Sequence, residues 1–176
     1  TLTPLQELAK SLHNCQRCKL ATLGRSQVVF GVGNPHASIM FVGEAPGFNE
    51  DQKGEPFVGA AGKLLNDLLA SAGLSRDQIY IANVIKCRPP NNRTPLADEA
   101  ANCREYLEGQ LDIIRPEFIC CLGSIAARNL LQTDGVEDRS EQLLRRRVER
   151  FRGVVTIVLT SELARRQQGA VPCDVV

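Results

Sequence analysis

The chain has 176 residues, of which 43% are hydrophobic and 23% charged, and its 21 Lys and Arg residues nearly balance 20 Asp and Glu residues. This length suits a single domain over residues 1–176, and the composition excludes disordered and fibrous classes. The net charge of +1 excludes a broadly basic nucleic-acid coat, so any contact with DNA must be local. No apolar run approaches the roughly 18 residues of a membrane span and no signal segment is recognisable, so we expect a cytoplasmic protein with no membrane partner.

Apolar periodicity predicts helices that alternate with strands. The expected elements are, in chain order, a helix over residues 3–12, a strand over 37–42, a helix over 59–72, a strand over 79–84, a helix over 98–114, a strand over 118–122, a helix over 124–131, a strand over 154–159 and a helix over 161–168. This order predicts an α/β fold of three layers, in which helices cover both faces of a central four-stranded parallel sheet. Such folds bind ligands beyond the carboxyl ends of their strands, so the loop 43–47, which follows the first strand, is a candidate site.

Seven cysteines are the second informative feature, because thiols of a reducing compartment more often bind metals or pack in the core than form disulfides. Cys15 and Cys18 form a C-x2-C pair, and Cys87 and Cys103 follow much later. Scattered thiolates favour a cubane iron–sulfur cluster over structural zinc, which more often uses two tight pairs; ordinary buried thiols are the third interpretation. The remaining cysteines are interpreted as core residues, Cys120 and Cys121, and an incidental residue near the terminus, Cys173.

Three motifs occur in order along the chain. The loop 43–47 reads Gly-Glu-Ala-Pro-Gly and precedes Glu50-Asp51; residues 54–65 read Gly-Glu-Pro-Phe-Val-Gly-Ala-Ala-Gly-Lys-Leu-Leu; residues 83–90 read Asn-Val-Ile-Lys-Cys-Arg-Pro-Pro. Together with the cysteines, these motifs resemble the family 4 uracil-DNA glycosylases from about residue 4 to residue 158. The resemblance implies a uracil-DNA glycosylase-like fold and a DNA-repair enzyme that hydrolyses the N-glycosidic bond of uracil, acting as a monomer on uracil-containing DNA. It also implies a [4Fe–4S] cluster on four cysteines, Cys15, Cys18, Cys87 and Cys103.

The resemblance assigns a uracil pocket. An asparagine amide carries both a donor and an acceptor, so Asn83 can pair with O4 and N3–H of a flipped uracil, and the ring of Phe57 is implied to stack on the base. Gly43 and Ala45 belong to the loop whose backbone N–H groups face the ring. From the residues alone, Asn83 could instead cap a strand and Phe57 could lie in the core.

Two carboxylates remain for catalysis, because Ala45 stands where better-known uracil glycosylases carry an acid. The resemblance implies that Glu50 faces the base or its attacking water, while Glu44 shapes the loop. A solvated loop charge is the alternative for either residue.

Two basic segments are candidates for phosphate binding. Residues 139–152 include six Arg and two Glu, among them Arg145, Arg146 and Arg147; a solvated helix face would explain the same charges. Arg88 and Arg93 flank a turn beside the third cysteine and form the second candidate patch.

The chain departs from the family near its end. The family carries a His-Pro motif after the fourth strand, whose His donates to the uracil carbonyl, whereas this chain has Leu159 near that place and only two histidines, His13 and His36. A shifted reading frame and true divergence both explain the difference. The sequence therefore predicts an impaired glycosylase, with a non-catalytic uracil- or damaged-DNA-binding protein as the alternative and a cluster-bearing electron-transfer protein as a third.

Overall fold

The computed structural model describes residues 2–131 and 153–157. The predictions for Arg145, Arg146, Arg147, Leu159, Cys173 and the helix over residues 161–168 lie outside this part. The elements, in chain order, are α1 (Pro4–Leu12), the 3-10 turn η1 (Lys19–Ala21), β1 (Val32–Gly33), β2 (Ile39–Gly43), α2 (Phe48–Lys53), α3 (Ala60–Ser71), β3 (Tyr80–Asn83), the 3-10 turn η2 (Pro90–Asn92), α4 (Ala97–Ile114), β4 (Phe118–Leu122), α5 (Ser124–Leu131) and β5 (Gly153–Ile157).

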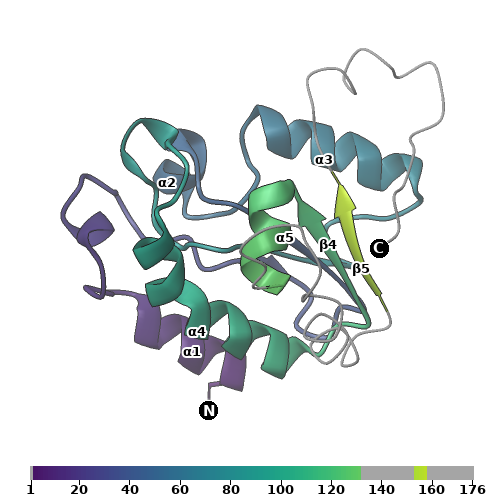
Figure 1. Ribbon diagram of the computed structural model, residues 1–176. Helices are drawn as coiled ribbons and strands as arrows, with labels where there is room; N and C mark the ends of the chain where they lie inside the picture. Colours follow the sequence, from purple (N-terminus) through teal and green to yellow (C-terminus); the bar gives the residue numbers. More distant parts are fainter. Residues whose placement is uncertain (1, 132–152, 158–176) are drawn as a thin grey trace, which may run out of the picture.

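The sheet has the strand order β1-β3-β2-β4-β5. Figure 1 shows β4 and β5 side by side. β3, β2, β4 and β5 run parallel, as predicted. β1 is antiparallel to β3 and pairs Val32 with Ile81, so the prediction of a purely parallel, four-stranded sheet was wrong at this edge. A two-residue strand is too short to show apolar periodicity, so this strand could not be predicted. Gly33 can approach β3 because it has no side chain; a Cβ atom there would collide with the Ile79 carbonyl oxygen.

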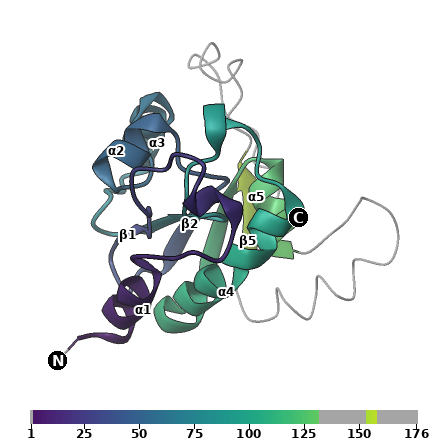
Figure 2. The ribbon, with the colours of Figure 1, turned by 90° about the vertical axis from the view of Figure 1, so that its left-hand side faces the viewer.

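Helices cover both faces of the sheet, which confirms the three layers. Alternate residues of β2 point to opposite sides: Met40 and Val42 pack with α4 and α5, whereas Phe41 packs with Leu65 and Leu69 of α3. Figure 2 shows α2 and α3 on one side of the sheet and α4 and α5 on the other, with α1 beside α4. No helix in residues 2–131 is long and apolar enough to cross a membrane.

The predicted helices form where local signals place them. Thr3 caps α1 by accepting the Gln6 N–H, and α4 ends at Arg115, which adopts a left-handed conformation before Pro116. Apolar periodicity did not predict α2, because its six residues are almost all polar and show no helical stripe. This short helix matters because it directly follows the loop 43–47.

Candidate functional site

The carboxyl ends of β2 and β3 bring the first and third motifs together. Gly43 and Asn83 are partners in the strand register, and the Val84 N–H donates to the Gly43 carbonyl oxygen at 2.9 Å. Asn83 is only 2% exposed, and its Oδ1 has no hydrogen-bond partner among the described residues. An unpaired buried acceptor costs about 1–3 kcal/mol, so this oxygen indicates a missing donor.

Phe57 lies against the same point. A Cβ atom added to Gly43 would lie 2.6 Å from Cε2 and Cζ of the Phe57 ring and closer still to Asn83 Oδ1. The bare backbone of Gly43 is therefore flanked by an aromatic ring and an amide oxygen. Three of the residues predicted to bind uracil thus meet at one place.

The backbone at Phe57 has a strained conformation, which contacts with Arg76 and Gly62 stabilise. Its φ is 55°, a left-handed conformation that is unusual for a bulky residue and often marks a functional site. Arg76 donates to the carbonyl oxygens of Pro56 and Phe57 at 2.8 and 3.0 Å. Gly62 of α3 lets the Phe57 carbonyl approach, since any side chain there would collide with it. Arg76 lies outside the three sequence motifs, so no motif predicted this contact.

Glu50 joins the two loops of the pocket. Its Oε1 accepts the N–H groups of Val58 and Gly59, both at 2.9 Å, and its Oε2 accepts the Gly47 N–H at 3.1 Å. These contacts show a carboxylate that holds loop backbone in place. They do not test whether Glu50 also faces a bound base, which stays a prediction.

Glu44 and Ala45 are the second and third residues of the loop 43–47. Burial raises the pKa of the half-buried Glu44 carboxyl above its ordinary value, and a hydrogen bond with the Thr94 side chain partly offsets this. Ala45 packs against the core cluster between the sheet and α4. Glu44 thus contacts the loop that precedes α4, and its predicted role in shaping the loop 43–47 stays a prediction.

The four predicted cysteine ligands share one neighbourhood. Cys87 and Cys103 are buried, while Cys15 and Cys18 are partly exposed. Burial raises the pKa of the Cys87 thiol to about 11, with Cys103 and Cys18 near enough to raise it further. Burial likewise raises the pKa of Cys103, which also interacts with Cys18 and Cys15. Cys121, interpreted as core, is buried in β4.

The donor set fits a cluster of several irons. Four thiols converge from three separate segments, whereas the described residues contain no group of three or more side chains arranged to hold a single metal ion. Cysteine thiolates are the ligands that hold iron–sulfur clusters, so the chemistry of these four side chains fits a cluster. Arg25, which the sequence analysis missed, joins two of the segments by donating to Cys87 Sγ and to the Cys15 carbonyl oxygen, both at 2.6 Å.

A buried lysine connects the pocket to the cysteines. Lys86 is fully buried, and its Nζ donates to the Asn83 carbonyl oxygen at 2.8 Å and to Gln110 Oε1 at 2.6 Å. Burial lowers the Lys86 pKa to about 7, and nearby Cys103 opposes this shift. Gln110 lies in α4, the helix that carries Cys103, so Lys86 ties the backbone of Asn83 to that helix. The sequence carried one sign of this buried contact, which is a lysine within the mostly apolar segment 79–87.

Arg88 and Arg93, which were predicted to bind phosphate, have different surroundings in the structure. Arg93 donates from both terminal nitrogens to the buried Glu99 carboxylate, at 2.8 and 2.7 Å, and so holds the Glu99 pKa below its ordinary value. Arg88 donates to Asn92 and lies over the ring of Phe48, with 5.1 Å between the guanidinium carbon and the ring centroid. Phosphate contacts by these residues stay predictions.

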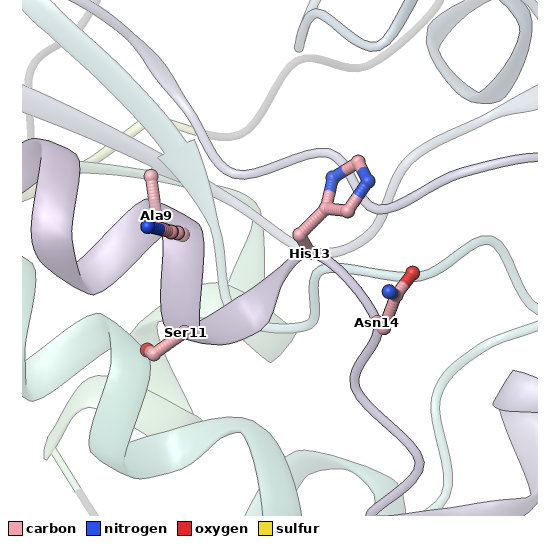
Figure 3. Close-up of a pocket in the computed structure, with 5 residues that line it drawn as sticks. Ala9, Ser11, His13 and Asn14 are labelled. Atoms are coloured by element: carbon pink, nitrogen blue, oxygen red, sulfur yellow. The ribbon is translucent and has the colours of Figure 1, made fainter.

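A surface hollow lies elsewhere, at the end of α1. It is lined by Ala9, Lys10, Ser11, His13 and Asn14, which all come from one stretch of chain (Figure 3). None of the residues predicted to bind uracil lines it. The cluster of Gly43, Phe57 and Asn83 is therefore the better candidate, because it combines backbone strain with a buried polar atom that has no partner among the described residues.

Comparison with known proteins agrees with this geometry. Residues 30–173 match the model of the uracil DNA glycosylase superfamily, which defines the class of protein. The type-4 uracil-DNA glycosylase of Archaeoglobus fulgidus is 54% identical over 124 residues, which are 70% of this chain and 62% of the relative. The type-4 uracil-DNA glycosylase of Pyrobaculum aerophilum is 45% identical over 139 residues, which are 79% of this chain and 69% of the relative. The one of Thermotoga maritima is 48% identical over 122 residues, which are 69% of this chain and 63% of the relative. The chain belongs to this superfamily and, within it, to the type-4 uracil-DNA glycosylases.

The chain spans about three fifths of the length of the Archaeoglobus and Thermotoga relatives. The matched residues include the loop 43–47 and the segment 83–90, because both lie within 30–173.

Proposed function

We propose that the chain excises uracil from DNA by hydrolysing its N-glycosidic bond. The observation that carries this proposal is the buried Oδ1 of Asn83 beside the Phe57 ring, which has no hydrogen-bond partner among residues 2–131 and 153–157. Uracil presents N3–H between two carbonyl groups, so N3–H can donate to Oδ1 while the amide nitrogen donates to O4. A flipped uracil supplies the donor that the site lacks and a flat surface for the ring.

Catalysis in this site is mainly electrostatic. When the glycosidic bond breaks, uracil leaves with the bonding electron pair and the sugar becomes an oxocarbenium-like cation. A water oxygen then bonds to C1′, and the proton that this water loses neutralises the uracil anion. Glu50 preorganises the loop 43–47 through the Gly47 N–H. Fixed backbone donors stabilise developing negative charge more than mobile solvent does, because they need no reorganisation.

The cofactor of this proposal is a [4Fe–4S] cluster held by Cys15, Cys18, Cys87 and Cys103. Its role is structural, since it cross-links the loop after α1, the loop after β3 and α4. Cys87 stands four positions beyond Asn83, so holding Cys87 restrains the segment that presents the base-reading amide. Free thiols of this kind suit a reducing compartment such as the cytoplasm.

A second function is favoured by one specific observation, the lack of any histidine after His36. Without the family's histidine donor, the same pocket would bind uracil-containing DNA with little turnover. The two functions differ only in the chemical step, because both use Asn83 and Phe57.

Single-turnover excision separates these functions. Excess protein is mixed with a labelled single-stranded oligonucleotide that carries one uracil, and abasic product is revealed by alkali; the control strand carries thymine instead. Excision confined to the uracil strand supports the enzyme, and tight uracil-dependent binding with no product supports the binding protein. Equal binding of both strands with no product would overturn both.

A further inference from the structure

An exposed aromatic residue stands beside the pocket. Phe48 is 54% exposed, more than the other large apolar side chains of the described residues. It directly follows Gly47 and begins α2. A single exposed apolar side chain is common on protein surfaces, so its surroundings decide whether it has a role.

Those surroundings are organised. The Arg88 guanidinium carbon lies 5.1 Å from the centroid of the Phe48 ring. Arg88 Nε donates to Asn92 Oδ1 at 2.7 Å, and Asn92 and Asn91 both adopt φ of 54°, a left-handed turn that sets the position of this side chain. Among the described residues, none accepts a hydrogen bond from the terminal nitrogens of Arg88. We call this pair the Phe48–Arg88 stack.

Its position follows from the sheet. The loop that carries Phe48 leaves β2 after Gly43, and the loop that carries Arg88 leaves β3 after Asn83. Gly43 and Asn83 are register partners, so both loops start at the same edge. A DNA strand whose uracil enters the pocket at this edge must continue across the loops that emerge there.

We infer that the Phe48–Arg88 stack is a second nucleotide site, which holds the nucleotide next to the flipped uracil. The base of that nucleotide extends the stack on the aromatic ring, and the terminal nitrogens of Arg88 bind its phosphate. This inference rests on the proposed function. Stacking on a ring tolerates any base, so the site adds affinity for the strand without adding sequence preference.

Binding of short ligands tests the inference on the full chain. The ligands are the mononucleotide dUMP, a trinucleotide with central uracil, the same trinucleotide with abasic neighbours, and one with central thymine. Phe48→Ala should weaken binding of the uracil trinucleotide by about 5- to 150-fold, while its dUMP and abasic-neighbour affinities stay at the parental value. Arg88→Gln should lower the salt slope of trinucleotide binding by about 1.

Matched variants separate a local effect from a general one. Phe118→Ala removes a ring that is 38% exposed at the start of β4, the opposite end of the sheet, and should bind every ligand as the parent does. Phe48→Tyr should retain most of the affinity, since the ring remains. Circular dichroism confirms that each variant is folded.

Two results would overturn the inference. One is parental affinity of Phe48→Ala for the uracil trinucleotide, and the other is an equal loss for dUMP, which would make Phe48 a support of the loop. Failure of the proposed function looks different, because the parent would then bind the uracil and thymine trinucleotides equally. A loss of thymine-trinucleotide affinity in Phe48→Ala would support the stack even in that case.

Discussion

Adding one methyl group at Gly43 tests where the base binds. In Gly43→Ala, the new carbon would lie 2.6 Å from the Phe57 ring and closer to Asn83 Oδ1, whereas real Cβ atoms essentially never approach other atoms within 3.0 Å. The ring or the amide must therefore move, and the methyl group takes space between them. Because stacking is worth about 1–3 kcal/mol per base, we expect the Kd for a uracil-containing strand to rise by roughly 5- to 150-fold.

The matched control is Gly109→Ala in α4. There the added carbon meets Cδ2 of Leu8 at 2.9 Å, the far end of a flexible side chain that can turn away, and alanine favours the helix by about 1 kcal/mol. Its uracil affinity should match that of the parent. Fluorescence anisotropy with uracil and thymine strands measures the discrimination, and thermal melting reports folding. A folded Gly43→Ala variant that still discriminates uracil like the parent would refute a pocket between Gly43, Phe57 and Asn83.

Four further predictions concern the pocket, the cysteines, an ion pair and the C-terminal segment. Asn83→Asp should lose uracil discrimination, because a carboxylate accepts but does not donate; unchanged excision would remove Asn83 from the site. Protein purified without oxygen should hold about four irons per chain, lost in Cys87→Ala and retained in Cys121→Ala; stoichiometric zinc without iron would contradict the cluster. Arg93 lowers the Glu99 pKa in the folded protein, so the ion pair stabilises the fold fully at pH values above the unfolded Glu pKa of about 4.3. This stabilisation disappears as the pH falls through the folded pKa of Glu99. The difference in melting temperature between the parent and Arg93→Gln should therefore close on acidification, and a gap that persists at low pH would oppose this. Replacing residues from Leu159 onward with a family-like His-Pro helix should raise single-turnover excision by about 10²-fold and affect binding much less; equal rates would show that another group stabilises the leaving uracil.

Local patterns in the sequence were sufficient for much of the fold. The wholly apolar run 118–122 matches β4 in both bounds, and the helix predicted over residues 3–12 matches α1, which Thr3 caps. These features depend on interactions between residues that are close in the sequence, so they can be predicted from the sequence alone. The edge strand β1 could not be predicted in this way, because Val32 and Gly33 become a strand only through pairing with β3.

The candidate site also has features that the sequence predicted and features that only the tertiary structure showed. The motifs around Gly43, Phe57 and Asn83, and the order of the four cysteines, were sufficient to assign the family by resemblance. Only the tertiary structure decided that Asn83 Oδ1 is buried with no partner in the described part of the chain, and that Arg25 joins two cysteine segments. It also decided that Lys86 ties Asn83 to α4. Such contacts join residues that lie far apart along the chain, and their energies depend on burial and distance, which the packed sheet and helices set.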